Sequence, residues 1–437
     1  MAGGTWTTQN KVRPGVYINF ESEPKPVGNV GERGVVTMAL PLNWGESKQV
    51  ITLQASSNLV DQLGYDRTAP EMLLICEVFK RARTLLLYRL NTGTKAAATQ
   101  GDLVATAKYG GARGNDITLV IQPNLDDNTK FDVRTLLDGK AVDQQLVANV
   151  SELNANQWVA FSGTGSLTAT AGLPLTGGTN GTVTNQDHTD YLAAIEVHDF
   201  QTLALPSSDS ALKSLYTAFT KRQREEEGKK IQTVLAQYPL ADSEGVISVK
   251  NGVVLADGTV LDAVQATAWV AGATAGAEIN ESLTYQAYDD AVDVQTRYTN
   301  TQVEEALKNG EFVFVPSKGR AIVEQDINTL KSFTPDKRKH FSKNRVIRVL
   351  DGIANDFKRI FEASYIGEVD NNADGRNLFR QECIAYLETL QGISAVQNVS
   401  AKDVIVEAGN DSDSISVDVT VQPVDAIEKI YMKVQVK

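Results

Sequence analysis

The two ends of this chain carry segments that have the pattern of strands but no local partner. In "NKVRPGVYINF", residues 10–20, Pro14 fixes its own backbone and favours extended geometry at Arg13. Apolar and polar side chains then alternate, which is the period of a strand with one apolar face; the apolar positions are Val16, Ile18 and Phe20. The next residues, "ESEPKPVGNVGERG", contain no turn that would fold back into a hairpin. The partner of this strand must therefore come from elsewhere, in the same molecule or in another.

The last residues, "IEKIYMKVQVK", repeat this alternation. Their apolar positions are Ile430, Met432, Val434 and Val436, and Lys433 and Lys437 lie on the polar face. The chain is thus expected to begin and end in an amphipathic strand. Unpaired strands invite uncontrolled association, which charged residues on the polar face limit.

Length and composition are those of a globular chain with several domains. With 437 residues, about two to four domains are expected. The formal net charge of −12 disfavours a nucleic-acid binder that works by bulk electrostatics.

Cys76 and Cys383 both lie in apolar stretches, which is typical of reduced, buried thiols. No secretory signal and no run of about 20 apolar residues is visible, so we expect synthesis in a reducing cytoplasm and no membrane insertion.

Helix and strand patterns alternate over most of the chain, which predicts an α/β (α+β) multi-domain fold with a mixed-sheet core. Between residues 93 and 185, Gly, Thr, Asn and Asp separate short runs such as "ITLVIQ", which predicts an inserted β-sandwich or barrel. The predicted parts are an N-terminal arm (1–29), a core domain (30–92 with 186–329), the inserted β domain (93–185), a C-terminal domain of helices and a hairpin (330–427) and a C-terminal strand arm (428–437).

Three local patterns give sharper structural predictions. The continuous apolar run "RTLLLYRLN", residues 83–91, has the length of a strand and predicts a buried one. In "GVISVKNGVV", residues 245–254, the Asn-Gly pair predicts a turn between two short strands. From Val346 to Phe361, apolar residues recur every three or four positions, which predicts an amphipathic helix.

The sequence offers little that could support catalysis. The histidines His188, His198 and His340 have no metal-ligand spacing, and neither a nucleophile elbow nor a phosphate loop is present. We therefore expect no catalytic residues and no cofactor.

One stretch partly matches a metal-binding loop. "DNNADG", residues 370–375, fits the first half of a calcium loop through Asp370, Asn372 and Asp374. The position for the closing glutamate is Gln381, so a polar connection between two helices is the favoured interpretation.

Positive charge is concentrated in "KSFTPDKRKHFSKNRVIR", residues 331–348, which contains seven Lys or Arg and one acidic residue. This segment is either an exposed helix start or a contact patch for an acidic partner surface. In the second interpretation the contact residues are Lys337, Arg338, Lys339 and Arg345.

These residues together resemble the sheath subunit of contractile phage tails, of phage-tail-like bacteriocins and of defective prophages, in particular those of Gram-positive bacteria. The resemblance extends over nearly the whole chain and is weakest in the β insertion. It rests on "NKVRPGVYINF", on "AWVAGATAGAEINESLTY" (268–285) and on the block from "INTLKSF" through "KNRVIRVLDGIANDF" to "YIGEVDNNADGRN".

The resemblance implies a structural protein. Sheath subunits stack as rings of six around an inner tube and contract to drive the tube through a cell envelope. In this family the terminal arms add strands to sheets of neighbouring subunits, which would place the partner of "VYINF" in another chain. The implied partners are further copies, the tail tube protein, the baseplate and the tail terminator, first in the host cytoplasm and then in a virion or tail-like particle.

Two other interpretations remain open. One is an α/β enzyme or ligand-binding protein with a β insertion, which is supported only by the alternation of helices and strands. The other is the sheath of a secretion-system-like injection machine, although such sheaths usually divide this role between two chains.

Overall fold

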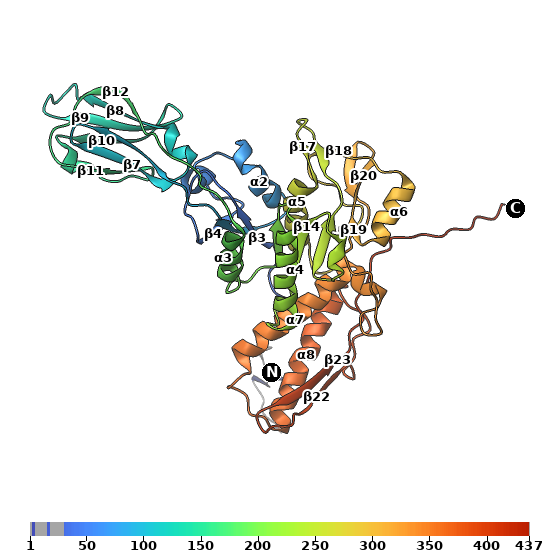
Figure 1. Cartoon of the computed structure of the whole chain (residues 1–437). Coiled ribbons are helices and arrows are strands. Elements are labelled where there is room, and N and C mark those ends of the chain that lie inside the picture. The colour runs from blue at the N-terminus through green and yellow to red at the C-terminus, as the bar shows by residue number, and fades with distance from the viewer. Residues whose placement is uncertain (1, 5–14, 18–29, 437) are drawn as a thin grey trace. The chain divides into compact units, whose positions relative to one another are not determined.

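The computed structural model describes residues 2–4, 15–17 and 30–436, with side chains from residue 30 onward. The chain divides into two compact units. Unit 1 comprises residues 1–31 and 356–422, and unit 2 comprises residues 32–355 and 423–437. Helix α7 (Asn344–Ser364) begins in unit 2 and ends in unit 1 (Figure 1).

A seven-stranded mixed sheet forms the centre of unit 2, with the order β19-β15-β14-β13-β3-β5-β4. All neighbouring strands run parallel except β4, which is antiparallel to β5. In chain order the strands are β3 (Val35–Leu40), β4 (Val50–Gln54), β5 (Thr84–Arg89), β13 (Thr202–Leu205), β14 (Gln232–Ala236), β15 (Val246–Val249) and β19 (Glu311–Phe312).

Helices cover both faces of this sheet, and the side chains of strand β5 pack against the helices on both faces. Every residue of β5 is buried, as the continuous apolar run predicts. Leu85 and Leu87 pack in one core with α2 (Leu73–Phe79) and α5 (Ala263–Gly276). Leu86 and Tyr88 point the other way, into a core with α3 (Asn185–Ile195) and α4 (Ser210–Glu225).

Small residues allow the helix α5 to lie deep in this core. A Cβ atom on Gly272 would come within 2.5 Å of the carbonyl oxygen of Val78, so α2 and α5 approach closely only because this residue is glycine. Trp269 of the same helix stacks on Tyr288 with ring centroids 4.3 Å apart. Unit 2 also contains α1 (Leu59–Leu63), which Gly64 ends at φ 80°, and α6 (Asn300–Lys308).

The predicted turn at Asn251 and Gly252 is wrong. Strand β15 belongs to the large sheet, whereas β16 (Val253–Leu255) pairs with β17 (Val260–Leu261) and β18 (Ala291–Val294) in a separate sheet. The Asn251 side chain instead bonds both the N–H and the C=O of Phe314, the first residue of the hairpin β20 (Phe314–Ser317) and β21 (Arg320–Val323). At Gly252 a Cβ atom would lie 1.8 Å from the carbonyl oxygen of Leu261, so this pair serves close backbone contact rather than a turn.

The inserted β domain is a sandwich of two antiparallel sheets, ordered β11-β7-β6 and β10-β9-β8-β12. Alternate residues of both sheets meet in one apolar core. The strands are β6 (Lys95–Gln100), β7 (Leu103–Gly110), β8 (Ile117–Pro123), β9 (Phe131–Leu137), β10 (Lys140–Val147), β11 (Val159–Ser162) and β12 (Thr170–Pro174).

Unit 1 is built around the second half of α7, helix α8 (Ala373–Gly392) and the hairpin of β22 (Val404–Ala408) and β23 (Ile415–Val419). The amphipathic helix, the second helix and the hairpin match the sequence-based predictions. Phe361 and Phe379 join the two helices with ring centroids 4.0 Å apart. The Tyr386 hydroxyl donates to Asp356 over 2.7 Å, and the Gly31 N–H donates to the same carboxylate.

The fully buried side chain of Arg89 joins the large sheet to the β domain. Its guanidinium donates to the carbonyl oxygens of Gly45 and Gly110, each over 2.7 Å, and to that of Thr92 over 3.4 Å. Burial lowers the pKa of Arg89 to about 10, which still leaves the group charged at neutral pH. The arginine therefore acts as a donor to three carbonyls at the point where the chain leaves β5.

Arg89→Met should lower the free energy of unfolding by about 3 kcal/mol, because buried carbonyls would lose their donor. Denaturant titration followed by tryptophan fluorescence measures this change. The matched control is Arg320→Met, which removes an exposed guanidinium from β21. An equal effect of the two substitutions would contradict the role given to Arg89.

Candidate assembly interface

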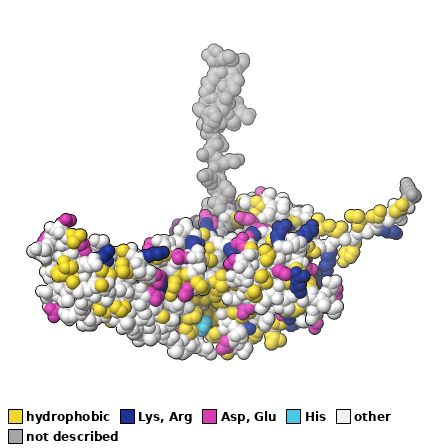
Figure 2. All heavy atoms as spheres, turned by 90° about the horizontal axis from the view of Figure 1, so that it is seen from above, with side chains coloured by type: hydrophobic (Ala, Val, Ile, Leu, Met, Phe, Trp, Pro, Cys, Tyr) yellow, Lys and Arg dark blue, Asp and Glu magenta, His cyan; other side chains and the backbone are white. Residues whose placement is uncertain are grey.

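The C-terminal arm, residues 428–437, is described as far as Val436 and forms no regular secondary structure over that range. The predicted strand is therefore not formed in the single chain. The four apolar side chains of its alternating face are at least three-quarters exposed: Ile430 77%, Met432 79%, Val434 76% and Val436 93%. Figure 2 shows the arm as a row of hydrophobic side chains that runs out from the body. An exposed apolar face of this kind is typical of a surface that binds a partner.

A largely buried carboxylate fixes the root of the arm to unit 2. Glu428 has only 11% of its side chain exposed, and it accepts hydrogen bonds from Thr284 over 2.9 Å and from Gln325 over 2.6 Å. Lys343 forms an ion pair with the same carboxylate. Burial alone would raise the pKa of Glu428, but the bonds from Lys343, Gln325 and Thr284 outweigh it and hold the pKa below the usual value.

Sequence reasoning missed this anchor, although it identified the arm. The partners of Glu428 precede it by 144, 103 and 85 residues, so no local spacing connects them to it, although Thr284 and Lys343 lie in stretches quoted above for the resemblance. A single glutamate in an alternating segment carries no signal of burial. Only the fold brings the four side chains together.

A groove of about 1050 Å³ lies beside the root of the arm. Apolar side chains and several lysines line it, and the arm itself supplies one wall. The lining residues that matter here are Leu307, Leu330, Phe333, Lys331, Lys339 and Ile427. Phe333 is 47% exposed, so the groove adds apolar surface to that of the arm.

The N-terminal arm is described only in part. Strand β2 (Gly15–Tyr17), which contains Val16, pairs in parallel with β1 (Ala2–Gly4) of the same chain. Ile18 and Phe20 lie outside the described residues. The two strands form a two-stranded sheet, so each leaves one edge without a partner in that sheet.

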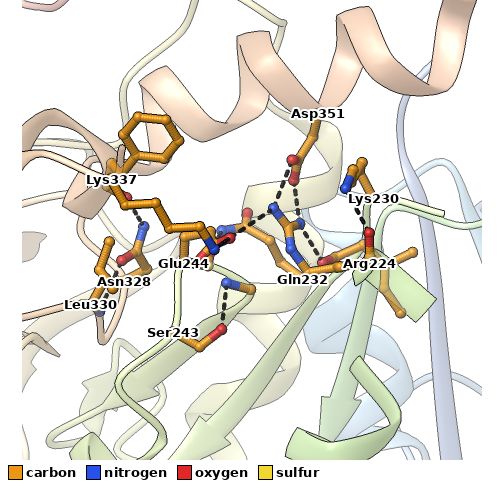
Figure 3. A network of polar contacts seen from close by, with 12 residues as sticks. Arg224, Lys230, Gln232, Ser243, Glu244, Asn328, Leu330, Lys337 and Asp351 are labelled. Atoms are coloured by element: carbon orange, nitrogen blue, oxygen red, sulfur yellow. Dashed lines mark hydrogen bonds and ion pairs between the residues drawn. The ribbon is translucent and has the colours of Figure 1, made fainter. Parts of the chain in front are cut away.

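The basic segment divides into residues that pair within the chain and residues that do not. Lys337 donates to Glu244 over 2.7 Å, and the arginine Arg224, 3.9 Å from Glu244, makes a two-bond ion pair with Asp351 of α7 (Figure 3). Burial alone would raise the pKa of Glu244, but Lys337 and Arg224 hold it below the usual value. Lys337 thus belongs to a network that fastens α7 to unit 2.

The other basic residues of the predicted patch are placed differently. Arg338 and Lys339 are exposed and make no ion pair with any other residue that the structure describes. Arg345 is half-buried at the start of α7. Among the four residues of the predicted patch, Arg338 and Lys339 are therefore the ones available to a partner.

The calcium candidate has a structural role. Asn372 caps α8, and its side chain accepts a hydrogen bond from the N–H of Gly375 over 2.8 Å. Asp370 and Asp374 lie on either side of this cap. Within the described ranges, no group of three or more His, Cys, Asp or Glu side chains is placed to hold a metal ion. Of the helices in the same ranges, none has the length and apolar character that a membrane crossing requires.

Family models match the chain in four consecutive segments. They are the tail sheath protein Gp18 domain III N-terminal region (33–90), the phage tail sheath protein beta-sandwich domain (91–180), the phage tail sheath protein central domain (181–329) and the phage tail sheath C-terminal domain (336–437). Since these segments extend over almost the whole sequence, the chain belongs to the phage tail sheath family.

Individual relatives agree with this assignment. The crystal structure of a sheath tail protein from Desulfitobacterium hafniense is 61% identical, covers 97% of this chain and 100% of that chain, and has a TM-score of 0.88. The phage-like element PBSX protein XkdK of Bacillus subtilis (strain 168) is 40% identical over 466 residues, which cover all of both chains. The helical sheath of the anti-feeding prophage in its contracted state is 14% identical, covers 97% of this chain and 99% of that chain, and shares the fold at a TM-score of 0.57.

Glu428→Gln should loosen the root of the arm at neutral pH. The hydrogen bonds to a charged acceptor would weaken by about 1.5 kcal/mol, which corresponds to about tenfold faster opening. Hydrogen–deuterium exchange of the peptide that contains residues 424–430 measures this change. Glu304→Gln is the control, because Glu304 is exposed on α6 and its ion pair with Lys308 is long, at 4.0 Å. Equal exchange rates in the two variants would contradict the anchor.

The lowered pKa of Glu428 also predicts a dependence on pH. A carboxylate whose pKa is depressed in the folded chain stabilises it fully above the unfolded value, about 4.3. That stabilisation is lost as the pH falls through the lower pKa of the folded state. The difference in arm exchange between the wild-type chain and Glu428→Gln, corrected for the intrinsic pH effect on exchange, should therefore shrink in acid.

Proposed function

We propose that this chain is the subunit of a contractile tail sheath that polymerises as stacked rings of six around an inner tube. Its terminal arms add strands to the sheets of neighbouring subunits, and the polymer contracts to drive the tube through a target envelope. The observation that carries this proposal is the exposed apolar arm held at its root by Glu428. Its role is structural, and no substrate or cofactor takes part.

The dimensions of the arms suit this role. The twenty residues 1–20 span up to about 65 Å when extended and the ten residues 428–437 up to about 35 Å, whereas a compact chain of this length has a radius of gyration of about 22 Å. An arm can therefore reach a neighbouring subunit. The family membership supports the same arrangement, because the solved sheath from the anti-feeding prophage is a helical assembly.

The energy of one arm is small, which favours assembly on a template. Each apolar side chain of the arm would contribute about 1.5–3 kcal/mol when buried. Ordering the backbone of the arm costs about 1–2 kcal/mol per residue, and each new hydrogen bond returns about 1 kcal/mol. One arm is therefore marginal, whereas a lattice in which every subunit gives and receives arms is stable. Free subunits stay apart until a tube and a baseplate bring them together.

The basic segment supplies the contact to the tube in this proposal. Arg338 and Lys339 are the exposed cations of the predicted patch, and Lys337 and Arg345 support them from partly buried positions. The remaining partners are the baseplate, the tail terminator and further copies of the chain. Assembly takes place in the host cytoplasm, and the product is a component of a virion or of a tail-like particle.

Deletion of residues 428–437, or of residues 1–20, should leave a folded chain that forms no sheaths. For the C-terminal segment the reason is that residues 429–436 are exposed in the single chain, and for the N-terminal segment the expectation rests on the family resemblance, in which both arms pass between subunits. Thermal unfolding and electron microscopy of the chain co-expressed with its tube protein measure the two properties. A chain with the residues of 429–437 reordered, so that the alternation is lost and the composition is kept, should behave like the deletion. Unfolding of the core by either deletion would show that the arms are ordinary core strands.

The double substitution Arg338→Glu and Lys339→Glu should uncouple the sheath from the tube. Reversal of two charges turns attraction to an acidic surface into repulsion, while the contacts of the arms stay intact. Electron microscopy would then show empty sheaths beside bare tubes. Lys318→Glu with Arg320→Glu is the matched control, because it reverses two exposed charges around the β20–β21 turn. Normal sheathed tubes after the first double substitution would remove this contact from the proposal.

A further inference from the structure

The part of the basic segment that directly precedes α7, residues 337–343, carries the exposed cations Arg338 and Lys339 and is called the contact loop below. It contains the short 3₁₀ helix η5 (Lys339–Ser342). Within the described part of the chain, the hydrogen bonds of residues 338–340 all end inside residues 335–343. The position of the two exposed cations therefore depends on how the two ends of the loop are held.

An ion pair holds each end of the contact loop. At its first residue, Lys337 donates to Glu244 over 2.7 Å (Figure 3). At its last residue, the ammonium group of Lys343 pairs with the Glu428 carboxylate at the root of the arm. Both lysines are thereby neutralised, so the free positive charge of the loop comes from the two exposed cations between them.

The last residues of the loop also have backbone partners, but these leave one charge to be balanced. The Asn328 side chain donates to the carbonyl oxygen of Phe341 over 2.9 Å, and its N–H donates to that of Ser342 over 3.1 Å. The side chain of Lys343 is only 16% exposed, and breaking a buried ion pair by removing one partner is strongly destabilising. Without Glu428 the ammonium group has to move toward water, which shifts the end of the loop.

The groove beside the root of the arm contains a second lysine–glutamate pair, which differs from the first in exposure. Lys308 and Glu304 lie one turn apart on α6 at 4.0 Å, and their side chains are 78% and 70% exposed. An exposed pair of this kind contributes little to stability. The pair of Lys343 and Glu428 lines the same groove, is mostly buried and joins two segments that are 85 residues apart.

We propose that the ion pair between Lys343 and Glu428 couples the root of the C-terminal arm to the contact loop, so that a displaced root weakens the contact with the tube. The two residues are positioning residues, because they hold Arg338 and Lys339 in place. The inference rests on the proposed function, since it takes the tube as the partner of this loop. It adds that the two contacts of one subunit, through the arm and through the loop, depend on each other.

The coupling acts in both directions. Because a coupling free energy is reciprocal, a tube bound to the contact loop also tightens the root of the arm. Conversely, a neighbouring subunit that displaces the arm removes one of the two fixed ends of the loop. The contact with the tube is then weakest when the arms are displaced, which is when the tube has to move through the sheath.

Hydrogen–deuterium exchange of the isolated full-length chain tests the coupling without a tube. Glu428→Gln should make peptides that contain residues 337–343 exchange about tenfold faster, because Lys343 loses its counter-ion. Gln325→Leu is the matched control, since it removes another donor to Glu428 and leaves the ion pair, so it should speed exchange only at residues 424–430. Equal acceleration of the loop by both substitutions, or none by Glu428→Gln, would overturn the coupling.

The strength of the tube contact is measured by electron microscopy as the fraction of sheaths that enclose a tube, in particles prepared over a range of salt concentrations. Glu428→Gln makes the groove more positive by one charge, so charge alone would strengthen the contact with an acidic tube, whereas the coupling weakens it. Glu304→Gln makes the same change of charge in the same groove and leaves Lys343 paired. Sheaths should therefore lose their tubes at lower salt with Glu428→Gln than with Glu304→Gln.

A second matched pair removes a positive charge instead. Lys343→Gln should lower the fraction of filled sheaths more than Lys308→Gln, which removes the same charge from an exposed site of the groove. Equal fractions within each matched pair would overturn the coupling and leave the sheath function intact. A wild-type chain that forms no sheaths around tubes would count against the proposed function, and the exchange rates of the isolated chain would still decide the coupling.

Discussion

One feature governs this molecule: an amphipathic segment at the C-terminus leaves its apolar side chains, from Ile430 to Val436, exposed in the single chain. The segment nevertheless starts from a fixed point, because Glu428 is held by Thr284, Gln325 and Lys343 of unit 2. A floating apolar tail would associate with any exposed strand edge. A tail with a fixed root reaches only those surfaces that lie within its length. The anchor would therefore limit nonspecific association and direct the arm to nearby surfaces.

The anchor is part of a larger polar network at the start of α7. Lys343 directly precedes Asn344, whose amide bonds Asp326 over 2.9 Å and Gln232 over 3.1 Å. One turn further along, Arg348 is fully buried beside Asp326, and Asp351 pairs with Arg224. Buried ion pairs of this kind add little net stability, but they are costly to break one partner at a time, and so they fix one geometry. A force on the arm would therefore be transmitted to α7 and to the central sheet through these polar contacts.

Patterns within a single element could be predicted from the sequence, and long-range partners could not. The buried strand β5, the helix α7 and the β22–β23 hairpin follow from local periodicity, since each pattern is set by which faces are buried. The Asn251–Gly252 pair misled the prediction because the same dipeptide suits both a hairpin turn and a close backbone contact with Phe314 and Leu261. The terminal arms are visible as alternation, yet the alternation does not identify the strand with which each arm pairs.

The distribution of charge adds to this account. A chain of net charge −12 repels its own copies at low ionic strength, so a polymer of many copies needs local attraction that outweighs this repulsion. In the proposed sheath, contacts between neighbouring subunits would supply this attraction. Screening acts over about 8–10 Å in physiological salt, so charged contacts of this kind would attract only once two subunits lie close together. Repulsion between whole subunits and attraction between contacting surfaces would therefore operate at different distances, which would keep free subunits apart until a template brings them together.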